Sequence, residues 1–137
     1  MGNTGLGKTH LSLAIAKEVV KQGFNVLYSP AYNLFSEIET EHFSLHINKT
    51  YENAVNCDLL IIDDLGGEFV SPYVQSVVYN IINTRINMAK PTIINTNLSM
   101  GQIEEKYSPR VSSRLIGEYT AKAFLGQDVR QLKKMKK

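Results

Sequence analysis

What this sequence lacks excludes several classes of protein. A single cysteine, Cys57, cannot form an internal disulfide and is typical of a reducing cytoplasm. No apolar run approaches membrane-spanning length and no signal peptide is recognisable, so we expect a cytoplasmic protein that does not contact a membrane. The net charge of +2 gives no overall field for nucleic acid, and we interpret the C-terminal lysines as a solvated tail.

The first nine residues carry the most informative pattern. Gly2–Thr9 reads GNTGLGKT, which fits G-x-x-x-x-G-K-[ST] with Gly5 as an additional flexible point. Such glycines let several backbone N–H groups converge on a phosphate, and a helix starting near Gly7 adds the positive end of its dipole. We expect Lys8 to reach the β- and γ-phosphates of a nucleotide, and the Thr9 hydroxyl to bind Mg²⁺.

The alternative is a glycine-rich turn that leads into an ordinary helix. It leaves Lys8 poorly placed, because a cation in the first helical turn opposes the helix dipole unless an anion neutralises both. A buried strand is expected before a phosphate-binding loop, whereas only Met1 precedes it here. The sequence therefore predicts nucleotide binding by a chain that begins inside its own site.

A second signal is the acid pair Asp63-Asp64, which follows the apolar run Cys57–Ile62. Apolar residues without alternation predict a strand buried on both faces of a parallel sheet, and ligands gather at the carboxyl ends of such strands. Successive strand residues point to opposite sides. We expect Asp63 to bind Mg²⁺, directly or through water, and Asp64 to polarise the attacking water. The alternative is a solvated acidic turn before Gly66.

The rest of the chain alternates helices with strands, which predicts an α/β fold with a parallel sheet and helices on both faces. Gly23 is expected to end the first helix, Ser71-Pro72 to begin another, and Ser99 with Gln102 to form a capping box. The expected strands are 24–28, 57–62, 92–96 and 119–125. The expected helices are 8–22, 32–38, 46–54, 72–86, a short one after Ser99, 109–117, and one after Asp128.

His42 and His46 are spaced to share a helix face, with Glu39 close enough in sequence to join them. A metal site could be built from these three side chains. An H-x-x-x-H pair with no cysteine nearby is a weak signal, however, and we interpret both histidines as solvated surface residues.

Three shorter motifs follow the two main ones along the chain: Thr96–Leu98, Arg110–Leu115 and Gly126–Arg130. In this order the sequence resembles the ATPase core of the bacterial replicative-helicase loaders, the DnaC/DnaI type of AAA+ protein, with the IstB transposition helpers as close relatives. The resemblance covers nearly the whole chain. It implies a P-loop NTPase with an AAA+ core over residues 1–137.

The resemblance also implies roles for individual residues. Asn97 matches the sensor-1 asparagine that orients the hydrolytic water, and Arg114 matches the arginine finger that reaches the ATP of a neighbouring subunit. Ser71 and Tyr73 fall where loaders contact single-stranded DNA. From the residues alone, Asn97 could equally be a polar strand end and Arg114 a surface arginine. Ser71 could equally be a helix cap and Tyr73 a surface tyrosine. The implied nucleotide-binding residues are Gly2, Asn3, Thr4, Gly5, Leu6, Gly7, Lys8, Thr9, His10 and the sensor-2-like Arg130.

Two departures from the family pattern are visible. Asp64 stands where many AAA+ proteins have glutamate. The strand before the phosphate-binding loop and the N-terminal domain that grips the helicase are absent from the sequence. We therefore expect an N-terminally truncated AAA+ core.

The function that follows is ATP-dependent helicase loading in DNA replication. ATP and Mg²⁺ would bind between subunits of a homo-oligomer on single-stranded DNA, with the replicative helicase as partner, and ATP would be hydrolysed to ADP and phosphate. A transposition helper with the same chemistry is the alternative. Two further alternatives are a small P-loop kinase, which would need an arginine-rich lid, and an incomplete fragment that binds nucleotide without activity.

Overall fold

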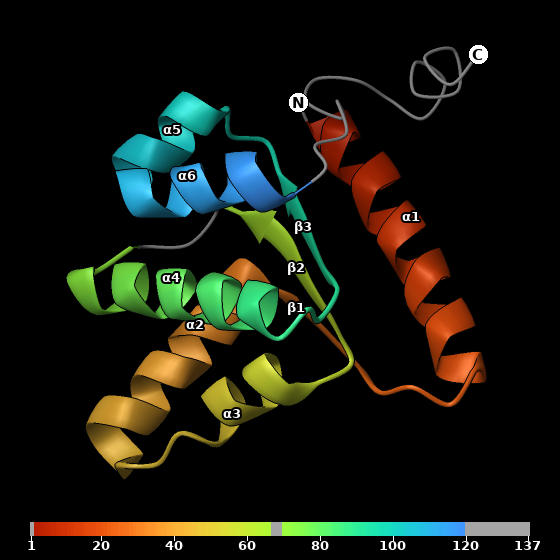
Figure 1. The fold of residues 1–137 in the computed structure, drawn as a ribbon, viewed down its shortest axis with the longest axis horizontal. Helices are drawn as coiled ribbons and strands as arrows, with labels where there is room; N and C mark the ends of the chain where they lie inside the picture. Colours follow the sequence, from red (N-terminus) through yellow and green to blue (C-terminus); the bar gives the residue numbers. More distant parts are fainter. Residues whose placement is uncertain (1, 67–69, 120–137) are drawn as a thin grey trace.

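A three-stranded parallel sheet with helices on both faces forms the centre of the molecule (Figure 1). The computed structural model describes residues 2–66 and 70–119, with side chains from Thr9 onward. The strands β1 (Val26–Pro30), β2 (Leu59–Leu65) and β3 (Thr92–Thr96) lie in the order β1-β2-β3. The predicted α/β architecture is thereby confirmed.

The helices fall into two groups around this sheet. Helix α1 (Gly2–Lys21) covers one face, and the remaining helices lie on the other side and along the carboxyl ends of the strands (Figure 1). They are α2 (Ala31–Thr40), the π-helical turn η1 (Glu41–Leu45), α3 (Lys49–Asn56), α4 (Pro72–Asn87), α5 (Met100–Lys106) and α6 (Pro109–Glu118).

The element boundaries agree closely with the sequence patterns. The predicted strand 92–96 is reproduced residue for residue, and those at 24–28 and 57–62 are shifted by two or three residues. The helix expected at 46–54 begins at Lys49, because the turn at η1 intervenes. The last expected strand, apart from Tyr119, and the helix after Asp128 lie outside the described residues.

The start of α1 differs from the expectation. The sequence predicts a loop over Gly2–Gly7, whereas the structure has Gly2–Lys21 as one continuous helix. Extending an existing helix forms one further hydrogen bond for each residue ordered, and this satisfies the backbone of the segment locally. The predicted end is confirmed, because Gly23 adopts a φ of +94° just beyond α1.

Three serine caps fix where helices begin. The Ser71 hydroxyl accepts from the Val74 N–H, with Pro72 as the first helical residue of α4. Ser99 and Gln102 form the complete predicted capping box of α5. The Ser108 hydroxyl accepts from the Val111 N–H at the start of α6. Each such cap contributes about 1 kcal/mol, so the helices around the carboxyl ends of the strands have well-defined starts.

The hydrophobic core lies between the sheet and the helices on the α2 and α4 side. Leu60 and Ile62 of β2 point into this core, and Ile61 between them points to the opposite face, which α1 covers. Both faces of β2 are therefore buried, as its unbroken apolar run predicts. The acid pair that follows is held on a rigid central strand.

Arg85 on α4 is fully buried and joins three segments of backbone. Its guanidinium nitrogens donate to backbone oxygens at the end of α3, just before β2 and before β3. They also donate to the side chains of Thr92 and Cys57. Burial lowers the pKa of this guanidinium, which nonetheless stays charged in proteins. The carbonyl partners are Ala54, Val55, Cys57, Asp58 and Pro91.

Glu41, at the start of η1, links this turn to α3 through hydrogen bonds. One carboxylate oxygen accepts from the Thr50 N–H at 2.8 Å, and the other accepts from the Thr50 hydroxyl at 2.5 Å. These hydrogen bonds favour the charged form and lower the pKa of Glu41 below its ordinary 4.5.

This contact predicts a pH-dependent difference in stability. Because the folded pKa of Glu41 is lowered, its contribution is present above pH 4.5 and is lost as the pH falls through the folded pKa. Thr50→Val removes the hydroxyl donor, so the variant is expected to be less stable than the parent at neutral pH, with the difference shrinking below pH 4.5. Urea unfolding at several pH values measures this.

Thr40→Val, a change at an exposed residue of α2, serves as the control and should show no such pH dependence. A difference between Thr50→Val and the parent that stayed constant through the acid range would contradict the role given to Glu41.

Candidate functional site

The strand register brings three polar side chains to the face of the sheet that α1 covers. Tyr28 is the register partner of Ile61, and Ile61 is the partner of Ile93. Because side chains alternate along a strand, Asp63 and Asn95, each two residues further on, share the face of this row. The site therefore lies between the carboxyl ends of the strands and α1.

Asp63 is the centre of a hydrogen-bond network at this place. Its Oδ2 accepts from the Thr9 hydroxyl of α1 at 2.8 Å and from the Tyr28 hydroxyl at 2.7 Å. Its Oδ1 accepts from Asn95 Nδ2 at 3.1 Å, and the same Nδ2 donates to the Ser12 hydroxyl at 2.7 Å. The network joins α1 to all three strands and brings the two predicted metal-binding residues, Thr9 and Asp63, into direct contact.

Asp63 and Asp64 lie in an irregularity of β2. Ile62 pairs with Ile94 and Leu65 pairs with Thr96, so three steps along β2 match two steps along β3. One extra residue is therefore inserted, and Asp64 adopts a left-handed φ of +57° and is exposed. Bulges of this kind re-aim side chains, and Asp tolerates the left-handed region better than most residues. The half-buried Asp63 and the exposed Asp64 thus have different surroundings, and their separate roles stay predictions.

Tyr28 is strongly perturbed by its position. Burial, followed by the hydrogen bond to Asp63 and the negative charge of that carboxylate, raises the pKa of Tyr28 to about 12. Its hydroxyl therefore stays protonated at neutral pH and acts as a donor to Asp63.

The turn after the acid pair is held by groups from the next strand and helix. The Thr96 hydroxyl donates to the Leu65 carbonyl at 2.7 Å, and Lys106 Nζ donates to the Gly66 carbonyl at 2.6 Å. Gly66 has a φ of +107°, and an added Cβ would lie only 2.6 Å from Leu98 Cδ1. A glycine is therefore required for the close approach of Leu98, which follows Asn97 directly.

The oxygen atoms at this site fit a hard divalent cation. Mg²⁺ is usually held by one or two carboxylates together with phosphate oxygens and waters rather than by a full protein cage. Asp63 and Thr9 supply one carboxylate and one hydroxyl in contact with each other. No group of three or more His, Cys, Asp or Glu side chains suited to a metal occurs among the described residues. Glu39, His42 and His46 therefore do not form such a group.

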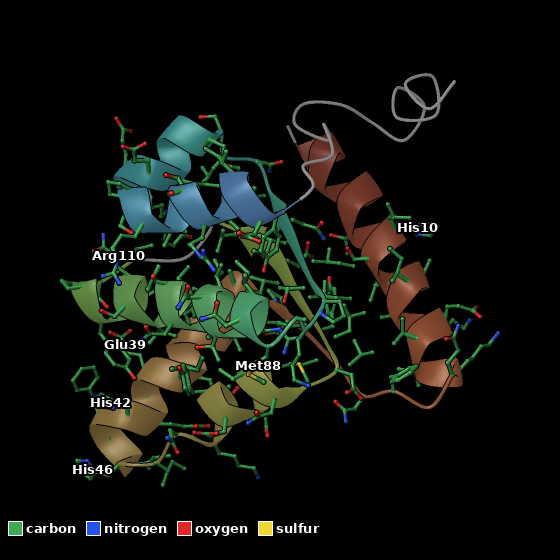
Figure 2. The ribbon with its side chains drawn as sticks, viewed as in Figure 1. His10, Glu39, His42, His46, Met88 and Arg110 are labelled. Atoms are coloured by element: carbon green, nitrogen blue, oxygen red, sulfur yellow. The ribbon has the colours of Figure 1, made fainter. Side chains whose placement is uncertain are left out.

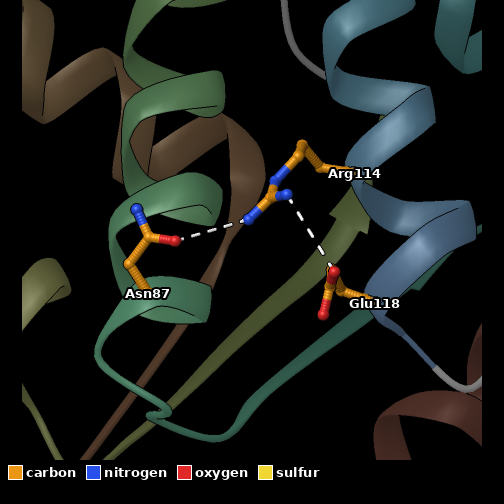
Figure 3. Close-up of polar contacts among 3 residues, drawn as sticks. All are labelled: Asn87, Arg114 and Glu118. Atoms are coloured by element: carbon orange, nitrogen blue, oxygen red, sulfur yellow. Dashed lines mark hydrogen bonds and ion pairs between the residues drawn. The ribbon is translucent and has the colours of Figure 1, made fainter.

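The other predicted catalytic residues lie outside the network. Asn97 is exposed just after β3, and Asn95, two residues earlier, is the asparagine that contacts Asp63. Arg114 on α6 faces α4 instead: its Nη2 lies 3.5 Å from Asn87 Oδ1 and its Nη1 lies 4.0 Å from Glu118 Oε2 (Figure 3). Both contacts are long, so they hold the guanidinium weakly.

The residues predicted to contact DNA have local partners. Ser71 caps α4 and its hydroxyl also donates to Glu39 Oε2 at 3.0 Å. The Tyr73 ring stacks on His42 at 4.5 Å and meets the edge of Phe43 at 5.1 Å. Figure 2 shows His42 and His46 far across the view from His10 on α1. DNA contact by Ser71 and Tyr73 stays a prediction.

Two of the predicted nucleotide-binding residues have described side chains, Thr9 and the exposed His10. The side chains of Asn3, Thr4, Leu6 and Lys8 lie outside the described part of the structure, as does Arg130, and their roles stay predictions.

Sequence reasoning missed three members of the network: Ser12, Tyr28 and Asn95. Asn95 had a visible signal, since it directly follows the apolar pair Ile93-Ile94 in the strand 92–96 and lies on the same face of that strand as Ile93. Tyr28 and Ser12 had none, because a tyrosine in a strand and a serine in a helix are common and their partners follow only from the register of distant segments.

The fold and the contact between Thr9 and Asp63 define a class of protein. The chain has the α/β fold of the AAA+ type of P-loop NTPase, with a parallel sheet covered by helices on both faces. Within this class the chain belongs to the family of IstB-like ATP binding proteins, whose family model matches residues 1–115.

Curated relatives include a protein named for helicase loading. The chain is 28% identical over 116 residues to the replicative helicase loader DnaC of Escherichia coli strain K12, which covers 83% of this chain and 47% of DnaC. The chain therefore spans about half the length of the curated relatives it matches.

Two solved structures have the same fold. The crystal structure of the DnaC helicase loader matches with a TM-score of 0.74 and 26% identity, over 85% of this chain and 71% of that one. The replication initiator DnaA bound to AMPPCP and single-stranded DNA matches with a TM-score of 0.74 and 28% identity, over 82% of this chain and 35% of that one. Among the described residues, no helix combines the length and apolar character needed to cross a bilayer.

Proposed function

We propose that residues 1–137 form the ATPase core of a helicase loader that binds ATP with Mg²⁺ and hydrolyses it to ADP and phosphate. The observation that supports this most directly is the 2.8 Å contact between the Thr9 hydroxyl and Asp63 Oδ2. It joins the end of the glycine-rich motif to an acid near the carboxyl end of the central strand, although the two residues are 54 positions apart in the chain. Membership in a family of ATP binding proteins agrees with the proposal.

Nucleotide binding on this proposal reshapes the start of α1. Residues 2–7 would wrap the phosphates as a loop, with the helix beginning near Gly7. The change is inexpensive, because Gly2, Gly5 and Gly7 each disfavour a helix by about 1 kcal/mol relative to alanine. Lys8 and the freed backbone N–H groups would then face the phosphates.

Asp63 and Asp64 have different roles in the proposed hydrolysis. Thr9 and Asp63 would hold Mg²⁺, whose charge would neutralise the phosphate oxygens. The exposed Asp64 would orient and polarise the attacking water, and Asn97 would support that water from the end of β3. Asp64 is exposed at a left-handed backbone position of the bulge, so its carboxylate is accessible to water.

Arg114 would act on the ATP of a neighbouring subunit. Its contacts within the chain, at 3.5 and 4.0 Å, are weak enough to exchange for a phosphate oxygen. The partners on this proposal are further copies of the chain, single-stranded DNA and the replicative helicase, and an arginine supplied in trans would couple hydrolysis to assembly.

Replacing Arg114 with alanine is expected to leave ATP affinity nearly unchanged and to lower turnover about a thousandfold, because a trans arginine acts on transition-state charge. Phosphate release from ATP by the assembled protein measures turnover, and fluorescent nucleotide titration measures affinity. Arg110→Ala, a change on the same helix, is the matched control and should retain turnover. Equal loss of binding and turnover in Arg114→Ala would contradict the assignment.

The same assay separates hydrolysis from group transfer. The γ-phosphate should appear as free phosphate whether or not a metabolite acceptor is added. Phosphate that appeared on an added acceptor instead would contradict an ATPase and indicate a kinase.

A further inference from the structure

The Asp63 carboxylate is held by donors from three separate elements. Thr9 donates from α1 and Tyr28 donates from β1, both to Oδ2, and Asn95 donates from β3 to Oδ1. Only Thr9 belongs to a nucleotide-binding motif. Tyr28 and Asn95 reach the same carboxylate from the two strands that flank β2 on either side.

These donors leave the carboxylate little freedom. An ionised carboxylate accepts at about four lone-pair positions, and three are occupied here from different directions. Asn95 is 7% exposed and Ser12, which accepts from the same Nδ2, is 2% exposed, so water competes poorly for these groups. The side chain of Asp63 is thereby fixed facing Thr9.

On the face of the sheet that α1 covers, polar side chains are concentrated around Asp63. Apart from Tyr28, the cross-strand row before Asp63 on this face consists of the apolar residues Ile61 and Ile93. Polar side chains occur on this face where the strands approach Asp63. A buried amide costs free energy unless it is hydrogen-bonded, so a sheet position of this kind favours an aliphatic residue when packing alone matters. Asn95 is instead satisfied by Asp63 and Ser12.

We propose that Tyr28 and Asn95 are positioning residues for the metal-binding acid. They hold Asp63 in the orientation in which it and the Thr9 hydroxyl receive the cation together. The inference rests on the proposed function, since it assigns these two side chains a role in the Mg²⁺ dependence of nucleotide binding. Partners that orient a metal ligand typically change metal affinity by about 10- to 100-fold when removed.

The test compares nucleotide affinity in Mg²⁺ and in EDTA for Tyr28→Phe and Asn95→Ala, with AMPPCP as the probe in isothermal titration calorimetry. Both variants should raise the Mg²⁺ concentration that half-saturates AMPPCP binding by about 10-fold or more, and should change the affinity in EDTA far less. A purely structural role would weaken both affinities alike. Tyr32→Phe, a change of an exposed tyrosine on α2, is the matched control and should behave as the parent.

A second measurement needs no nucleotide. In a double-mutant cycle by urea unfolding, the loss of stability caused by Tyr28→Phe should be smaller in an Asp63→Ala background, because the hydroxyl has then already lost its acceptor. Equal losses in both backgrounds would show that the contact is not made and would overturn the proposal.

The outcomes distinguish the two levels of inference. An unchanged Mg²⁺ requirement in both variants, with normal binding by the parent, would overturn the positioning role and leave the proposed function intact. Failure of the parent itself to bind AMPPCP in Mg²⁺ would contradict the proposed function.

Discussion

Replacing Arg85 with methionine is expected to lower the free energy of unfolding by about 3 to 5 kcal/mol, enough to unfold much of a marginally stable domain. The methionine fills a similar volume but donates no hydrogen bond. It would remove the donors of carbonyls between α3 and β2, including those of Val55 and Cys57, which Arg85 reaches at 3.0 and 2.8 Å. Urea unfolding followed by circular dichroism measures the loss.

Two further variants sharpen this prediction. Arg85→Lys keeps the charge but loses the planar fork of donors, so it should still cost about 2 kcal/mol. Arg110→Met is the control, because its guanidinium lies over the Tyr79 ring at the surface, and it should cost less than about 1 kcal/mol. Loss of stability in Arg110→Met equal to that in Arg85→Met would contradict the structural role of Arg85.

Gly66→Ala is expected to cost about 3 kcal/mol and to lower ATP turnover as well. The φ of +107° is unfavourable for an L side chain, and the new Cβ would meet Leu98 Cγ at 2.8 Å and Cδ1 at 2.6 Å. Relieving that clash moves Leu98, and with it the adjacent Asn97 that we propose supports the hydrolytic water. Thermal unfolding and phosphate release measure the two effects.

Gly117→Ala is the matched control for Gly66→Ala. Nothing lies within 4 Å of a Cβ added at Gly117, which is helical, so this change should stabilise the protein slightly. In the double variant Gly66→Ala/Leu98→Ala the clash is absent, so the loss should be smaller than the sum of the two single losses. A Gly66→Ala protein as stable as the parent would contradict the close approach of Leu98.

Local sequence patterns predicted most of the fold. Ser71-Pro72 and the Ser99–Gln102 box marked helix starts correctly because a cap is made by residues within one turn of each other. The unbroken apolar run before Asp63 predicted a strand buried on both faces, since burial on both sides leaves no alternation. These features depend on neighbours in the chain, and the sequence contains those neighbours.

Features that depend on distant partners could not be read in the same way. Arg85 lies in a helix where an arginine is ordinary, and its partners come from segments up to 31 residues away. Tyr28 reaches Asp63 across 35 residues, through a register that no local pattern encodes. The pairing of Thr9 with Asp63 was nonetheless predicted, because the chemistry of a nucleotide site requires both residues beside one metal.

Binding of ATP to the protein and to Asp63→Asn, each in Mg²⁺ and in EDTA, tests the central claim most directly. The account predicts that the parent binds ATP more tightly in Mg²⁺ than in EDTA, because Asp63 and Thr9 hold the cation together. Asp63→Asn should lose that enhancement while keeping its affinity in EDTA. A parent protein without affinity for ATP, or an Asp63→Asn variant with the full enhancement by Mg²⁺, would contradict the account.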